Sequence, residues 1–149
     1  MIHGVVVLLW LGLCALQDMR QRQIANRLTL GAALLALIYL LWTGTTWLGA
    51  PAGQGGWALA LAVLLTLPGY ALGRFGAGDV KLLGALALAS AVDHVLWSLI
   101  GAAVAQGAWV LIHQWLAGPA RCPSDHASTK QPFAPFVWVG FALYWLWIH

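Results

Sequence analysis

The sequence has very little charge. Only 7% of its 149 residues are Asp, Glu, Lys or Arg, whereas 62% are hydrophobic. Soluble domains carry roughly 25% charged residues, and one small core could not hide so much apolar surface from water. The composition therefore excludes an ordinary soluble domain and predicts an integral membrane protein. Because the net charge is only +3, we do not expect nucleic acid as a partner.

Cysteine is also scarce, and the motifs of common hydrolases are missing. Cys14 and Cys122 lie far apart without a CxxC spacing, so the sequence indicates neither a zinc site nor a disulfide framework. It contains no GxSxG, no HExxH and no glycine-rich phosphate loop that ends in GK[ST]. We therefore expect no cofactor and no metal, and any catalysis must use one of the few ionisable side chains.

Apolar runs account for most of the chain. The six runs cover residues 2–17, 28–48, 56–73, 80–92, 95–117 and 134–148. Glycine, proline or charge separates them, which predicts an all-α, polytopic membrane protein of about six transmembrane helices. We expect one membrane domain over residues 1–149, without a separate soluble or zinc-binding domain. The run 80–92 gives a helix of only ~20 Å, which is too short to span the membrane. We therefore expect either that the helix continues back through the glycine turn before it or that this turn dips into the membrane.

The basic residues are distributed unevenly. If the chain crosses the membrane at each run, all seven Lys and Arg residues fall on one side, and the loops at 49–55 and 93–94 contain none. The positive-inside rule places the basic side in the cytoplasm and both termini outside. Because basic residues follow the first run and do not precede it, we expect a retained helix and not a cleaved signal peptide.

Two of the four acids fall on the predicted cytoplasmic side beside apolar runs. Asp18 follows the first run, and Asp79 follows the Gly76–Gly78 segment at the start of the fourth. Ionisable residues at membrane depth are costly and usually mark function. Two carboxylates that lie close together hold one proton between them, so one can activate water while the other bonds a carbonyl oxygen. The pair indicates peptide hydrolysis, whereas we expect Asp93 on the outer face and Asp125 in a solvated loop.

Residues near the two aspartates are candidates for supporting roles. We expect the Gly76–Gly78 segment to form a turn with positive φ that lets another backbone approach. Lys81 either tunes the acid pair or extends to the surface, and we expect Asn26 to cap the second helix. We expect Arg20 and Arg22 to contact lipid headgroups, with contact to substrate as the alternative.

Three segments carry motifs in a recognisable order. They are DMRQRQIANRLTL at 18–30, FGAGDVKLL at 75–83 and QPFAPF at 131–136. In this order they resemble D-x-R-x-R-x-I-P-N-x-L-T-L, GxGD-V-K-L and I-P-F-G-P-F of the type IV prepilin peptidases, which are membrane aspartic proteases of the GxGD type. Ala25 and Ala134 stand where that family usually has Pro and Gly. We expect these departures to touch neither acid.

The resemblance implies a function and a location. Asp18 and Asp79 would be the catalytic dyad of an enzyme that removes the short basic leader from prepilin-like precursors, cutting after a glycine. The site would lie at the cytoplasmic face of the bacterial inner membrane. The chain resembles the short, peptidase-only members found with tight-adherence pilus systems, so we do not expect methylation of the new N-terminus. Prepilin-like proteins and membrane lipids are the expected partners, and the sequence predicts no oligomeric state.

Two alternatives remain open. The first is a GxGD protease that cuts within transmembrane segments. The second is a non-enzymatic transporter subunit or scaffold whose acids bind ions or protons. That second alternative predicts acids deep in the bilayer that face each other across a pore, whereas both aspartates here map to one edge beside basic loops.

Overall fold

The computed structural model describes residues 2–21, 25–72, 76–117 and 133–148, and almost all of these residues are helical. The helices are α1 (Ile2–Gln21), α2 (Asn26–Thr43), α3 (Ala52–Ala71), α4 (Ala77–Ala89), α5 (Val92–Ala117) and α6 (Ala134–Ile148). The only β pairing in the described ranges is an isolated bridge between Thr45 and Pro51. The prediction of an all-α fold is confirmed.

Four helices are long and apolar enough to cross a membrane, and the protein is a multi-pass membrane protein. These are α1, α2, α3 and α5. The other two are shorter, with 13 residues in α4 and 15 in α6. At 1.5 Å per residue α4 is ~20 Å long, as predicted. The helix begins at Ala77 and includes Gly78, so it continues back into the glycine segment, which is the first of the two expected alternatives.

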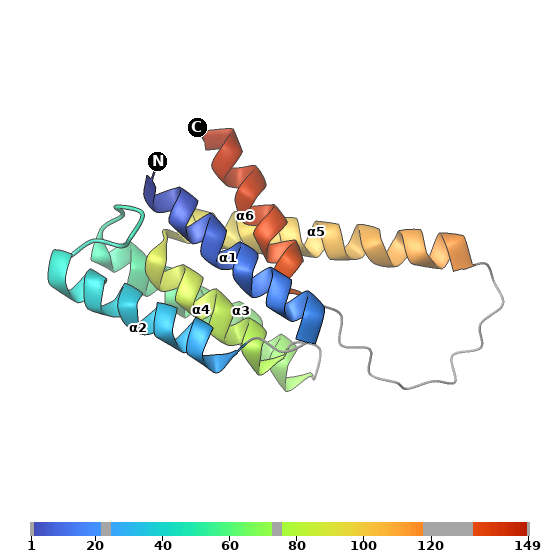
Figure 1. Cartoon of the computed structure of the whole chain (residues 1–149), viewed down its shortest axis with the longest axis horizontal. Helices are drawn as coiled ribbons and strands as arrows, with labels where there is room; N and C mark the ends of the chain where they lie inside the picture. The colour runs from blue at the N-terminus through green and yellow to red at the C-terminus, as the bar shows by residue number, and fades with distance from the viewer. Residues whose placement is uncertain (1, 22–24, 73–75, 118–132, 149) are drawn as a thin grey trace.

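The short α4 is the central helix of the bundle. It packs against α2 and α3, while α6 packs against α1 and α5 (Figure 1). Its side chains Leu82, Leu83 and Leu86 are fully buried. Because its neighbours surround it, α4 needs no lipid contact along a full membrane thickness. Apolar residues on the outer helices are exposed instead, for example Leu35 at 70% and Trp115 at 89%, as expected for surfaces that face lipid.

The two ends of the bundle differ in charge. At one end, the ring of Trp145 lies beside Gly4, and the ring of His3 lies 5.2 Å from that of Trp47. The start of α1, the end of α6 and the α2–α3 connection therefore meet there, and Figure 1 shows the two termini on the same side. The opposite end holds the cations of the described segments, which are Arg20, Arg27 and Lys81.

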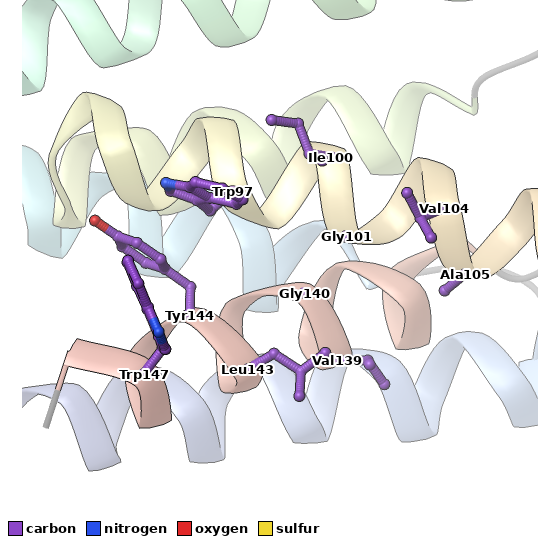
Figure 2. Close-up of a pocket in the computed structure, with 10 residues that line it drawn as sticks. All are labelled: Trp97, Ile100, Gly101, Val104, Ala105, Val139, Gly140, Leu143, Tyr144 and Trp147. Carbon is purple, nitrogen blue, oxygen red and sulfur yellow. The ribbon is translucent and has the colours of Figure 1, made fainter.

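Helices α5 and α6 cross with their backbones in contact. A Cβ atom added at Gly101 of α5 would lie 2.5 Å from the Cα of Gly140 in α6. One added at Gly140 would lie 2.6 Å from the carbonyl oxygen of Ser98. Figure 2 shows the two glycines on adjacent stretches of the two helices. This crossing fixes α6 against the bundle without large side chains in between.

We predict that Gly140→Ala destabilises the fold, because the new methyl group must push α6 away from the α5 backbone. Overpacking of this kind costs about 1–3 kcal/mol, measurable as the free energy of unfolding in mixed detergent micelles. Gly107→Ala on α5 is the matched control, since a Cβ there would meet nothing within 4 Å. Equal stability of the two variants would contradict the close crossing.

Candidate active site

Asp18 is buried at the end of α1. Its helix face also buries Leu11, Cys14 and Ala15, and the 3- and 4-residue spacing turns Asp18 inward with them. Only 6% of Asp18 is exposed. A buried carboxylate is costly unless it is hydrogen-bonded, and here the Oδ2 atom accepts the backbone N–H of Ala134 at 3.1 Å. The buried acid therefore depends on the first turn of α6.

Asp79 lies in the first turn of α4 and is partly exposed. Its Oδ2 atom accepts the backbone N–H of Gly76, the residue before the helix, at 3.0 Å. This is one half of a capping box; the reciprocal bond would need a side chain at Gly76. The bond fixes the carboxylate at the helix N-terminus, where a negative charge is favoured.

Gly76 allows the carboxylate of Asp79 to come close, but not in the predicted way. Its φ is −78° and its ψ is 152°, so the expected positive φ is wrong at this position. A Cβ atom at Gly76 would instead lie 3.3 Å from Oδ2 of Asp79. Glycine is favoured here by the space that the carboxylate occupies. Gly78 is part of α4 and not of a turn.

Lys81 and Asn26 meet across the bundle. The Lys81 Nζ atom donates to Oδ1 of Asn26 at 2.9 Å, although the two residues are 55 positions apart. Asn26 is the first residue of α2, and the cap residue is Ala25, without a side-chain cap bond. The prediction that Asn26 caps α2 is therefore wrong. Its side chain connects the start of α2 to the second turn of α4.

The predicted site residues gather at the basic end of the bundle. One connection joins Ala134 to Asp18, and a second joins Lys81 to Asn26. The backbone N–H of Ala25 also donates to Oε1 of Gln17 at 3.4 Å, which joins α2 to α1. The ends of α1, α2, α4 and α6 thus meet around the two aspartates. That the two carboxylates face each other stays a prediction.

Two of the remaining charged candidates, Arg20 and Asp93, lie in segments that the structure describes. Arg20 is exposed in the last turn of α1, while Arg22 lies outside the described residues. Asp93 is exposed in the first turn of α5, at the opposite end of the bundle. Asp125 and Cys122 also lie outside the described residues. In the segments that the structure describes, no three His, Cys, Asp or Glu side chains gather into a potential metal site.

Ala134 is the residue that sequence reasoning missed. Its backbone N–H donates to Asp18, a contact that we did not expect at this position, although glycine would supply the same N–H. A second backbone hydrogen bond to this carboxylate comes from Phe133. One signal was present in the sequence. The third motif, at 131–136, overlaps the start of the apolar run 134–148, and the first N–H groups of a helix have no partner within it.

An apolar groove lies elsewhere, between α5 and α6. Its volume is about 480 Å³, and Figure 2 shows the rings of Trp97, Tyr144 and Trp147 gathered at one end of it. The rings of Trp97 and Tyr144 stack at 5.8 Å. No acid lines this groove. The groove therefore lacks the acidic side chains that the predicted peptide hydrolysis requires.

Comparison with known proteins supports one family. No curated protein and no solved structure matches the chain. A family model described as the type IV leader peptidase family matches residues 5–111. The matched region contains Asp18, Asp79 and the Lys81–Asn26 contact, and the third motif lies beyond it. Because the match covers more than half of the sequence, this multi-pass membrane protein belongs to the type IV leader peptidase family and is a protease.

Proposed function

We propose that this protein is an aspartic endopeptidase that removes the short basic leader from prepilin-like precursors at the cytoplasmic face of the bacterial inner membrane. Asp18 and Asp79 form its catalytic dyad. The observation that supports this most directly is the position of both acids at one end of the bundle, each bonded to a backbone N–H at the start of a helix. The family match supports proteolysis.

The proposed reaction uses the two carboxylates and one water molecule. The ionised carboxylate takes a proton from water, and the water oxygen attacks the carbonyl carbon of the peptide bond. The protonated carboxyl group donates a hydrogen bond to the carbonyl oxygen, which becomes negatively charged in the tetrahedral intermediate. The carboxyl groups then deliver a proton to the leaving nitrogen as the C–N bond breaks. Asp79 is the more exposed acid, so the peptide approaches from its side.

The membrane setting explains the proposed substrate. The position of Arg20, Arg27 and Lys81 at the aspartate end supports a cytoplasmic location of that end under the positive-inside rule, and both termini would then lie outside. A precursor whose basic leader precedes an apolar helix would present its cleavage site at that edge. A Cβ atom at Gly76 would lie 3.3 Å from the Asp79 carboxylate, so there is little space beside this acid. A substrate residue without a side chain, a glycine before the cut, suits such a site.

The two alternatives make different demands on the site. A transporter with paired acids needs them along a path through the bundle, whereas the fully buried leucines of α4 fill its centre. A protease that cuts within transmembrane segments would use the same dyad. The mass of the product distinguishes it, because its cut would fall inside the apolar helix of the substrate and not before it.

We predict that Asp18→Asn and Asp79→Asn each abolish cleavage. Loss of one general acid or base typically lowers the rate by roughly 10²- to 10⁴-fold, and here the two acids act as a unit. The measurement is co-expression with a prepilin-like precursor, followed by mass analysis of its N-terminus. Thermal unfolding in detergent checks that each variant folds.

Asp93→Asn is the matched control for the dyad, because Asp93 is an exposed acid at the other end of the bundle. It should process the precursor normally. Substantial processing by Asp18→Asn or Asp79→Asn would refute the dyad. Inhibition by a chelator that added zinc reverses would indicate a metal mechanism instead.

Topology gives a second prediction. Gln21 and Gln54 are both exposed, at opposite ends of the bundle. In a background with Cys14→Ala and Cys122→Ser, we expect Gln54→Cys to react with an impermeant thiol reagent in intact cells and Gln21→Cys to react only after permeabilisation. The opposite pattern would place the aspartates outside the cytoplasm.

The Lys81–Asn26 hydrogen bond gives a third prediction. Lys81→Ala and Asn26→Ala remove the same bond, so we expect each to lower kcat/KM by a similar factor, roughly fivefold for a bond of ~1 kcal/mol. The double variant should be no worse than either single variant. Asn26→Asp, which keeps an acceptor oxygen, should retain most activity, and Arg27→Ala is the neighbouring control. Additive losses in the double variant would contradict a shared role.

A further inference from the structure

The support of Asp18 comes from a distant part of the chain. The N–H of Ala134 reaches its carboxylate from 116 positions away. Ala134 is fully buried and Phe133 is 5% exposed, so water does not replace these donors easily. The first N–H groups of a helix lack intrahelical acceptors and carry partial positive charge. The carboxylate therefore meets donors whose directions are set by the backbone of α6.

Contacts far from Asp18 hold α6 in place. The indole N–H of Trp138 donates to the carbonyl oxygen of Leu8 in α1 at 3.1 Å. Val137 is fully buried. One turn further, the backbones of Gly140 and Gly101 meet, and Figure 2 shows them beside each other on α6 and α5. Helix α6 is thus packed against α1 on one side and α5 on the other, and these contacts fix the position of its first turn.

We propose that the first turn of α6 is a positioning element of the active site and that the backbone N–H of Ala134 fixes the Asp18 carboxylate for catalysis. This inference rests on the proposed function. A carboxylate that activates water must hold one orientation, and errors of about 1 Å in placement cost orders of magnitude in rate. A side-chain donor would have to be fixed in one rotamer to hold the carboxylate. The backbone N–H at the start of a packed helix already has one orientation.

The use of a backbone donor defines which substitutions matter. Any residue except proline supplies an N–H, and the buried position admits only small side chains. Ala134 is the first residue of α6, where proline fits the helix and its missing N–H breaks no intrahelical bond. Ala134→Pro therefore removes the donor to Asp18 without breaking a hydrogen bond within α6, although Pro135 follows directly and a residue before proline disfavours helical backbone. Ala134→Gly keeps the donor and removes only a methyl group.

The test compares these two variants of the full chain in detergent, with a synthetic precursor peptide that includes the leader and the start of the apolar helix. We expect kcat of Ala134→Pro to be roughly 10- to 100-fold below that of Ala134→Gly, the effect of losing one hydrogen bond to a charged group. KM should differ by about twofold or less, because the bond positions a catalytic group and does not bind substrate. Thermal unfolding should be similar for both.

A backbone ester separates the hydrogen bond from the bulk of the proline ring. Lactic acid incorporated in place of Ala134 replaces the N–H by an oxygen of similar size, and this variant decides the question if Ala134→Pro does not fold. A folded ester variant with the kcat of Ala134→Gly would overturn the inference. If Asp18→Asn were inactive in the same assay, the proposed dyad would still stand. Activity of Asp18→Asn would refute both.

Discussion

A buried carboxylate at the end of a membrane helix needs hydrogen-bond donors, and this requirement governs the arrangement of the whole bundle. Asp18 is 6% exposed and obtains its donors from the start of α6. For these amides to arrive there, α6 must run antiparallel to α1 along its length, and the Trp138–Leu8 bond shows that it does. The close crossing at Gly140 in turn holds α6 against α5. The packing of α1, α5 and α6 thus supplies the hydrogen-bond donors that stabilise the carboxylate of Asp18.

The second acid meets the same constraint with a local solution. Asp79 takes the N–H of Gly76 three residues before it, so its support lies within the turn that begins α4. The position of that turn, by contrast, depends on contacts with other helices. The fully buried side chains of α4 hold the helix between its neighbours, and the Lys81–Asn26 bond joins its second turn to α2. The carboxylate of Asp18 therefore meets the N-terminus of α6 and that of Asp79 the N-terminus of α4, where the helix dipole favours negative charge.

The parts of the fold that sequence could predict are those set by hydropathy. Six apolar runs, punctuated by glycine and charge, gave six helices because lipid requires every backbone group to bond within its own segment. The two aspartates were selected because acids at membrane depth are rare and costly. The details that failed depend on tertiary contacts. Asn26 looks like a helix cap, but its amide meets Lys81 instead, and Gly76 is explained by the Asp79 carboxylate and not by a positive φ.

Ala134 shows why the remainder was out of reach. A side-chain ligand leaves a chemical trace in the sequence, because only a few residue types can serve, whereas a backbone N–H is supplied by every residue except proline. Position 134 can therefore hold alanine where the resembled motif has glycine and still donate to Asp18. What position 134 provides in this chain is the start of a helix and a small buried side chain. Recognising that role requires knowing which helix end meets which acid, and that knowledge comes only from the packed structure.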